Sequence, residues 1–174
     1  TFAGGAGNDR ILAANNINND WGGSASLSGA AFNKVGIEGG DGNDSISLNG
    51  NNTVSNINVN SNVGADDVSF VSASISGASI IGLGQGNDIF SGTLEEISTS
   101  TIAGGKGNDT IDLSATLTTQ VVVGGDRANA NMIDGDGNDS IYIAGGSVIS
   151  STIYGGGGND SLTWSGDLGS GNTV

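Results

Sequence analysis

The chain lacks several residue types on which common protein chemistry depends. It has no cysteine, no histidine and no proline, and its 174 residues include only 4 lysines and arginines against 18 aspartates and glutamates. Without histidine and cysteine, a Ser-His-Asp or Cys-His nucleophile system and a zinc site with the usual ligands are excluded. The formal net charge of −14 argues against sequence-independent binding of nucleic acid, which requires lysine and arginine to neutralise phosphates. The chain has no run of about 20 apolar residues, so we predict no membrane span.

Glycine, in contrast, is abundant, and much of it falls in one repeated string, Gly-Gly-x-Gly-Asn-Asp-x-apolar. The complete copies are GGAGNDRI from Gly4, GGDGNDSI from Gly39, GGKGNDTI from Gly104 and GGGGNDSL from Gly155. The variant copies are NVGADDV from Asn62, LGQGNDIF from Leu83 and GDGNDSI from Gly135. The final aspartates of successive copies are separated by 35, 22, 22, 21, 30 and 21 residues. The sequence therefore has a period of 21 or 22 residues, with insertions near 12–35 and 126–134.

Apolar residues occupy fixed positions relative to the final aspartate of each copy. They stand two and four positions after it, as Ile46 and Leu48 do, and seven positions before it, as Ile37 and, in the sixth copy, Met132 do. Polar residues alternate with them on both sides of a glycine-rich turn, which predicts two short strands per repeat and no helix. A unit of this size cannot bury its own apolar side. We therefore expect an all-β, right-handed parallel β-solenoid of about seven coils, with residues 1–174 forming a single domain that carries two insertions.

The repeated string resembles the nonapeptide of RTX (repeats-in-toxin) proteins, which is a calcium-binding β-roll or β-helix repeat. The resemblance implies that calcium ions are held by the motif aspartates and by backbone carbonyls of the glycine-rich turns. The implied side-chain ligands are Asp9, Asp44, Asp66, Asp88, Asp109, Asp139 and Asp160. The implied carbonyl donors are Gly5, Gly7, Gly40, Gly42, Gly84, Gly86, Gly105, Gly107, Gly135, Gly137, Gly156 and Gly158.

The chain departs from the common RTX β-roll in the spacing of its motif. The common β-roll repeats the nonapeptide without interruption, so that both turns of every coil bind calcium. Here the motif occurs once per coil, and we expect the opposite turn in stretches rich in Ser, Asn and Thr, such as NGNNT at 49–53 and GTLEE at 92–96. The sequence therefore predicts a calcium ladder along one edge only, an arrangement shared with calcium-dependent ice-binding solenoids.

The stacked aspartates have an electrostatic consequence that does not depend on the resemblance. Two carboxylates about 5 Å apart repel each other by roughly 3 kcal/mol at an effective dielectric constant of about 20. Carboxylate and carbonyl oxygens are hard ligands that suit Ca²⁺, and ions between the coils would couple metal binding to folding. About five or six Ca²⁺ ions would carry +10 to +12, close to the −14 of the chain. The alternative is a stack of metal-free Asx turns.

Other polar and aromatic residues leave two interpretations open. The motif asparagines are predicted to form a hydrogen-bonded ladder, with an outward ligand-binding face as the alternative; they are Asn8, Asn43, Asn87, Asn108, Asn138 and Asn159. Four further aspartates either add ligands or are solvated; they are Asp41, Asp126, Asp134 and Asp136.

Trp164 continues an apolar column as core or end cap, and the Glu95-Glu96 pair is predicted to be solvated. In the tail, Thr173 takes the aspartate position of a decayed copy. The two insertions are interpreted as bulges or edge-covering loops, with ligand binding as the alternative.

The function that we expect is non-enzymatic. The chain is predicted to be an extracellular, calcium-binding structural module of a secreted bacterial cell-surface or matrix protein (S-layer-, filament- or adhesin-like) that folds on binding calcium. Its partners are calcium ions and, because open solenoid ends expose strand edges, further copies stacked end to end or in an array; the chain would then be a fragment or repeating unit of a larger assembly.

Two other functions remain as alternatives. One is a calcium-binding accessory domain of a secreted RTX enzyme or toxin, with catalysis outside these residues. The other is an ice-binding solenoid, which usually has threonine between the motif glycines. This chain instead varies at that position, with Ala6, Asp41, Val63, Gln85, Lys106, Asp136 and Gly157.

Overall fold

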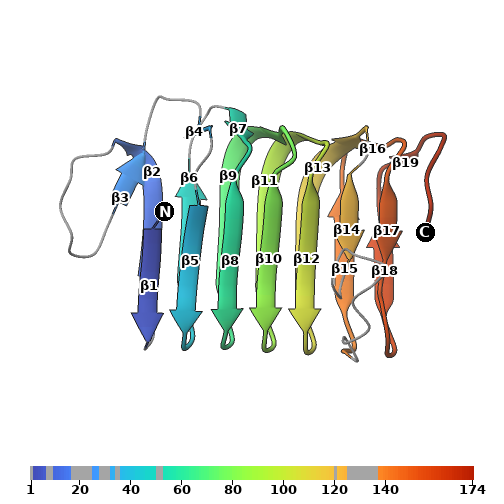
Figure 1. The fold of residues 1–174 in the computed structure, drawn as a ribbon. Helices are drawn as coiled ribbons and strands as arrows, with labels where there is room; N and C mark the ends of the chain where they lie inside the picture. The colour runs from blue at the N-terminus through green and yellow to red at the C-terminus, as the bar shows by residue number, and fades with distance from the viewer. Residues whose placement is uncertain are drawn as a thin grey trace.

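The chain folds into stacked β-coils (Figure 1). A computed structural model describes residues 2–6, 10–16, 25–27, 32–33, 36–49, 53–119, 121–124 and 137–174. All regular structure in these ranges is β-strand, and none of it is a helix that could cross a membrane. The predicted all-β parallel solenoid is thereby confirmed.

The strands form two parallel sheets whose order follows the succession of the coils. The seven-stranded sheet runs β1 (Phe2–Ala6), β5 (Gly36–Asp41), β8 (Asn58–Val63), β10 (Ile80–Gln85), β12 (Thr101–Lys106), β14 (Val122–Gly124) and β17 (Thr152–Tyr154). The main path of the twelve-stranded sheet runs β18 (Ser161–Trp164), β15 (Ser140–Ala144), β13 (Thr110–Thr118), β11 (Ile89–Ser98), β9 (Asp67–Ser76), β6 (Ser45–Asn49), β2 (Arg10–Asn16) and β3 (Ala25–Leu27). Four short strands complete this sheet: β4 (Phe32–Asn33), β7 (Thr53–Ser55), β16 (Ser147–Val148) and β19 (Asp167–Leu168).

The register of the seven-stranded sheet places apolar residues in one column, which is buried from Ile37 to Ile153. This column consists of Phe2, Ile37, Val59, Ile81, Ile102, Val123 and Ile153. Val123, and not Met132, pairs with Ile102 and Ile153. The assignment of Met132 to the column was wrong because the insertion falls between β14 and the glycine turn, and not before the strand. The insertion at 126–134 itself lies outside the described residues.

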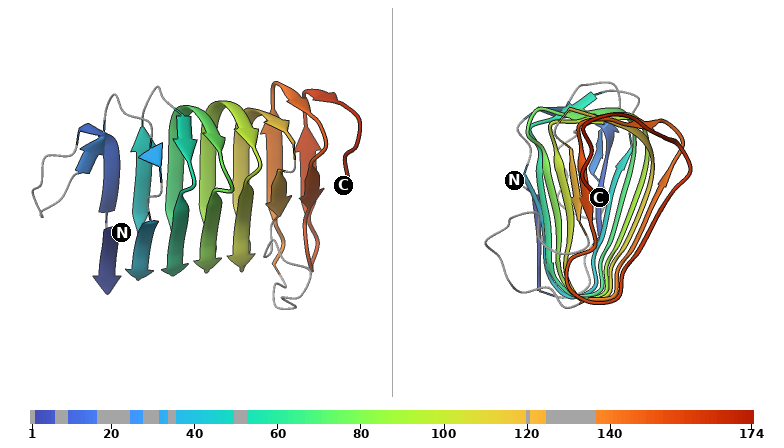
Figure 2. Two further views of the ribbon diagram at one scale, coloured as in Figure 1. Left: turned by 45° about the horizontal axis from the view of Figure 1, so that its top comes forward. Right: turned by 90° about the vertical axis from the view of Figure 1, so that its right-hand side faces the viewer.

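The second sheet bends around the wide side of each coil, as the view along the axis shows (Figure 2, right). Strands β9 and β11 each have 10 residues, and β13 has 9. Residues 92–96 therefore lie within β11, which corrects their assignment to the opposite turn. Buried and less buried residues alternate from Ile89 to Glu95, and the strand continues past an irregularity at Glu95-Glu96, where its pairing with β13 shifts register. Glu95 and Glu96 are exposed, as predicted.

The core is a continuous file of aliphatic side chains with two aromatic rings at its centre. Phe70 and Phe90 pack edge to face, with ring centroids 5.5 Å apart and an interplanar angle of 78°. Both rings are buried, as are Leu83 and Leu113. Edge-to-face pairs of this kind add to area burial, so the coils in the middle of the stack have the most robust core.

The number of regular coils is smaller than expected. The chain forms about five regular turns and not seven, because the two insertions interrupt the first and sixth coils. In the described part of the first insertion, β3 pairs with β2 at the edge of the sheet and β4 pairs with β7, so this part covers a sheet edge.

The last coil also differs in part from the expectation. Trp164 continues the column of Ile143 and is 39% exposed at the end of the sheet. Thr173 pairs with Thr152 and so extends the seven-stranded sheet, which corrects its assignment to an aspartate position in a turn.

Candidate metal centre

The glycine-rich turns stack into one edge of the solenoid, at the bottom of Figure 1 and at the narrow end of the cross-section in Figure 2. Gly86 shows why this edge requires glycine, because its φ is 145° and a Cβ there would overlap the carbonyl oxygen of Gly64 in the preceding coil. The same close approach to the preceding coil recurs at Gly64, Gly107, Gly137 and Gly158. Each coil thus presents a backbone carbonyl oxygen along the axis toward the next coil.

The motif aspartates lie inside this edge, one above another. Five of them are nearly inaccessible to solvent, with exposures of 1–3%: Asp44, Asp66, Asp88, Asp109 and Asp139. The Oδ1 atom of Asp88 accepts a hydrogen bond of 2.8 Å from the backbone N–H of Asp66 in the preceding coil. Equivalent bonds of 2.8–2.9 Å join the other neighbours along the stack from Asp44 to Asp160. The structure therefore brings six of the seven predicted aspartates into one ladder, while Asp9 lies outside the described residues.

Burial controls the electrostatics of this ladder. The second oxygen of Asp88, Oδ2, is buried and accepts no hydrogen bond. Burial raises the pKa of Asp88 to about 7, the backbone N–H of Asp66 opposes the rise, and the charge of Asp66 adds to it. The pKa of Asp66 is also raised by burial, against hydrogen bonds from Asp44 and Ser61, with the charge of Asp44 adding to the rise. Ionisation of a carboxyl group with a raised pKa lowers the stability of the folded protein, unless a cation compensates the charge.

The first glycine of the motif makes room for the aspartate of its own turn. A Cβ on Gly39 would overlap Oδ2 of Asp44, and a Cβ on Gly155 would overlap the carboxyl group of Asp160. The carboxylate thus occupies the space on the inward side of the strand that a side chain would otherwise fill. This explains the glycine at this position in the complete motif copies.

The motif asparagines form a second ladder on the outer side of the turns. The Oδ1 atom of Asn43 accepts a hydrogen bond of 2.9 Å from the backbone N–H of Ala65 in the next coil. Bonds of 2.7–2.9 Å continue this pattern through Asn87, Asn108, Asn138 and Asn159. The predicted hydrogen-bonded ladder is confirmed for these residues. The asparagine oxygens accept hydrogen bonds from the next coil, whereas the aspartate oxygens accept them from the preceding coil. Together the two ladders hold successive turns against each other.

The donor set at this edge fits a calcium ion. Among the described residues, no group of three His, Cys, Asp or Glu side chains is placed to hold a metal, so a metal here would need backbone oxygens as well. The axial glycine carbonyls supply such oxygens beside a buried carboxylate, and Ca²⁺ takes six to eight oxygen ligands. The residues that fit are the carboxylates and glycine carbonyls of the stacked turns. Of the predicted carbonyl donors, Gly7 and Gly135 lie outside the described residues.

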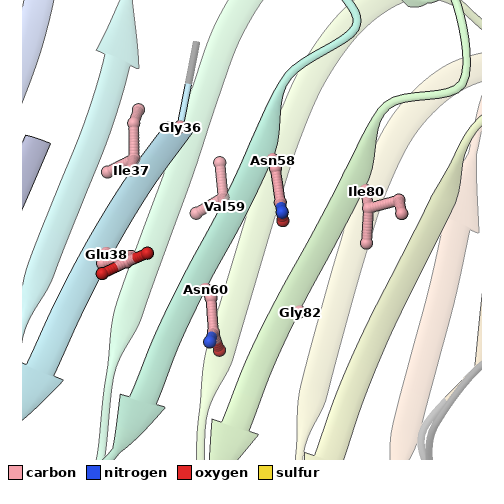
Figure 3. A pocket seen from close by; sticks show the side chains of 8 residues that line it. All are labelled: Gly36, Ile37, Glu38, Asn58, Val59, Asn60, Ile80 and Gly82. Carbon is pink, nitrogen blue, oxygen red and sulfur yellow. The ribbon is translucent and has the colours of Figure 1, made fainter. Parts of the chain in front are cut away.

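A groove on the outer face of the seven-stranded sheet is a separate feature (Figure 3). It crosses β5, β8 and β10, and its exposed side chains include Glu38, Asn58, Asn60 and Ile80. The Asn60 amide donates a 2.7 Å hydrogen bond to Oδ1 of Asn62. Glu38 is the one ionisable group among the lining residues, and acid–base catalysis commonly needs a second. The residues that line the groove include none of the predicted metal ligands.

Sequence reasoning did not predict that the residues replacing the first motif glycine are buried. Ser61 and Leu83 take this position in two coils, and both are fully buried. It also missed three buried serines at the opposite corner of the coils, Ser79, Ser100 and Ser151; Val121 takes this position in the coil between the last two. The signal in the sequence is weak, because these serines follow Ala78, Thr99 and Ser150 in stretches with the composition of a solvated turn.

Comparison with known proteins supports the metal assignment. A family model for the RTX calcium-binding nonapeptide repeat matches four segments, residues 1–16, 37–55, 99–115 and 150–163. These segments contain Asp9, Asp44, Asp109 and Asp160, and they leave out the turns of the other motif aspartates. No curated protein and no solved structure matches the chain. The chain forms a β-solenoid and carries, in these four segments, the RTX calcium-binding nonapeptide repeat.

Proposed function

We propose that this chain is a structural rod of a secreted, extracellular protein, and that calcium binding along its glycine edge drives its folding. The observation that carries the proposal is the ladder of buried aspartates, stacked one per coil and joined by hydrogen bonds through their Oδ1 atoms. Seven strands about 4.8 Å apart give the rod a length of roughly 30 Å.

The aspartates make the folded state dependent on a cation. Neighbouring ionised carboxylates in the ladder repel by roughly 3 kcal/mol per pair at an effective dielectric constant of about 20. The unfolded chain separates these charges and leaves them hydrated. Calcium supplies positive charge and coordination positions for several oxygens, so binding to the folded state alone stabilises that state by mass action.

The proposed location follows from the same coupling. A chain with a formal net charge of −14 stays extended where calcium is scarce, as in a cytosol, and this suits export. Outside the cell, calcium at about 10⁻³ M would fill sites in the affinity range of extracellular modules, about 10⁻⁴ to 10⁻³ M. We therefore expect the midpoint of calcium-induced folding in this range, and a midpoint below 10⁻⁶ M contradicts the extracellular assignment.

A calcium titration followed by far-ultraviolet circular dichroism tests the proposal. We expect a change from coil to β-structure on adding Ca²⁺, reversed by excess chelator. Asp109→Asn keeps the size of the side chain but removes a charge from the ladder, and it should shift the midpoint to higher calcium. Asp112→Asn makes the same change at an exposed position of β13 and should leave the midpoint unchanged. A spectrum that is identical in calcium and in excess chelator contradicts the proposal.

A further inference from the structure

The first position of the glycine motif forms an inward column along the stack. Gly82 pairs with Ala103 and Gly84 with Gly105, so Leu83 lies opposite Gly104. By the same register, Gly39, Ser61 and Leu83 face one another in successive coils, and all are buried. In this column the two side chains of Ser61 and Leu83 stand at consecutive positions and fill space. The glycines on either side of them, Gly39 and Gly104, leave space.

This space is the one that the carboxylate uses in a complete motif. At Gly39 and Gly155, the carboxyl oxygen of the same turn lies where a Cβ would stand. In the coils of Asp66 and Asp88, the Cβ and the rest of a buried side chain occupy the inward side of that strand. The Leu83 side chain offers no oxygen to a cation, and the Ser61 hydroxyl, a neutral group, donates a hydrogen bond to the Leu83 carbonyl.

The two coils differ from the others in further respects. In the coil of Asp66, Asn62 replaces the second motif glycine with a φ of 74°, and Ala65 replaces the motif asparagine. The buried Phe70–Phe90 pair belongs to these same coils. Apolar packing is thus greatest where the motif is least complete. Both turns, like that of Asp139, lie outside the four matched repeat segments.

We propose that the calcium ladder is interrupted: the turns of Asp66 and Asp88 hold no ion, and they form a metal-free, apolar segment between two groups of calcium-binding coils. The inference rests on the proposed calcium binding and refines where the ions lie. It lowers the expected number of ions below the five or six that a continuous ladder would hold. The middle coils are held by their core, and the flanking coils by metal.

A pair of matched variants tests the interruption. Asp88→Asn and Asp109→Asn make the same change in adjacent coils, and an asparagine Oδ1 can still accept the backbone hydrogen bond from the preceding coil. Bound calcium is counted by elemental analysis after equilibration in saturating calcium, and by calorimetric titration. We expect Asp88→Asn to bind as many ions as the unmodified chain, and Asp109→Asn to lose about one ion.

The possible outcomes separate the inference from the proposed function. Loss of an ion in Asp88→Asn overturns the interruption while leaving calcium binding intact. An unmodified chain that binds no calcium overturns the proposed function itself.

Restoring the motif gives a second test. Leu83→Gly recreates the sequence GGQGND in the fourth coil, and we expect it to gain about one ion. The gain should disappear in the double variant Leu83→Gly with Asp88→Asn. A folded Leu83→Gly protein that binds no additional calcium contradicts the inference. If the loss of this buried leucine prevents folding, the comparison of Asp88→Asn with Asp109→Asn decides alone.

Discussion

The two corners of each coil perform the same task, which is to stack a tight turn on a copy of itself, with different chemistry. The glycine corner buries a carboxylate and directs carbonyl oxygens along the stack. The opposite corner, which we call the serine corner, uses a residue with a φ of 46–58° in each coil; these residues are Asn56, Ala78, Thr99, Thr119 and Ser150.

The serine corner satisfies its polar groups with neutral partners. The Ser79 hydroxyl donates a 2.6 Å hydrogen bond to the Ser76 carbonyl and accepts one of 3.2 Å from the backbone N–H of Ile57. Ser100 and Ser151 donate similar bonds to carbonyls two residues earlier. The backbone N–H of Ala78 also bonds to the Thr99 carbonyl in the next coil, at 2.8 Å. Because the described residues of this corner carry no buried charge, we expect metal dependence only at the glycine corner.

The glycine corner leaves no room for a side chain at Gly86, whereas Gly145, in the bend between β15 and β16, has room for one. Gly86→Ala adds a Cβ that overlaps the backbone oxygen of Gly64 and strains a φ of 145°, so we expect a loss of about 3–5 kcal/mol in unfolding free energy. Gly145→Ala is the control, because this glycine also has a positive φ, 67°, but nothing lies within 4 Å of its Cβ position. It should cost about 1 kcal/mol. Denaturant unfolding in calcium measures both, and equal losses would contradict the close stacking of the glycine corner.

The glycine corner should also make the metal-free protein sensitive to pH. The pKa of Asp88 is raised to about 7, above its value of about 3.9 in an unfolded chain. Between these values the folded state binds more protons, so stability falls as the pH rises from about 4 to 7. Ionisation of one such group lowers the free energy of unfolding by up to about 4 kcal/mol, and by less once solvent screening is included.

Far-ultraviolet circular dichroism of calcium-free protein at pH 5 and pH 8 measures this effect, and we expect the larger folded fraction at pH 5. Asp88→Asn cannot ionise and should lose part of the difference between the two pH values. A metal-free protein that is more stable at pH 8 than at pH 5 would contradict the burial of uncompensated carboxyl groups.

The contrast between the corners also explains what could be predicted from the sequence. The glycine corner was predictable, because Asp44, Asp88 and Asp109 recur at a nearly constant spacing and because few residues other than glycine tolerate its backbone. The serine corner was not, because Ser79 and Ser100 have the composition of a solvated turn, and only the register shows that they are buried.

The separation between successive motif aspartates also does not determine where in the coil an insertion lies. An extra segment before or after a strand gives the same separation between aspartates, which is why Met132 was assigned a position that Val123 occupies. In the same way, the repeated motif does not reveal which turns can hold an ion, since that depends on the side chain that faces each aspartate.

Removing a hydroxyl from the serine corner should have a smaller effect than altering the glycine corner. Ser79→Ala removes a buried donor and leaves the N–H of Ile57 without this partner, so we expect a loss of about 1–2 kcal/mol. Ser114→Ala makes the same change at an exposed position of β13 and should stay within about 0.5 kcal/mol. Both are measured by denaturant unfolding in calcium. If Ser79→Ala lowers the free energy of unfolding no more than Ser114→Ala does, the hydrogen bonds of Ser79 do not stabilise the protein.

The smallest expected effect is a gain in stability at the serine corner. Thr99 is exposed and β-branched, and its φ of 46° lies in the left-handed region, where asparagine is better tolerated than threonine. Asn56 already occupies the equivalent position two coils earlier, so Thr99→Asn should stabilise the protein by about 0.5 kcal/mol and raise its melting temperature by about 1–2 °C. Thr93→Asn is the control, because Thr93 is an exposed residue within β11, where asparagine is unfavourable and should lower stability slightly. If Thr99→Asn destabilises the protein as Thr93→Asn does, the threonine contributes something that its backbone conformation does not reveal, and its hydroxyl, which lies 3.5 Å from the Thr119 carbonyl, is the first group to test.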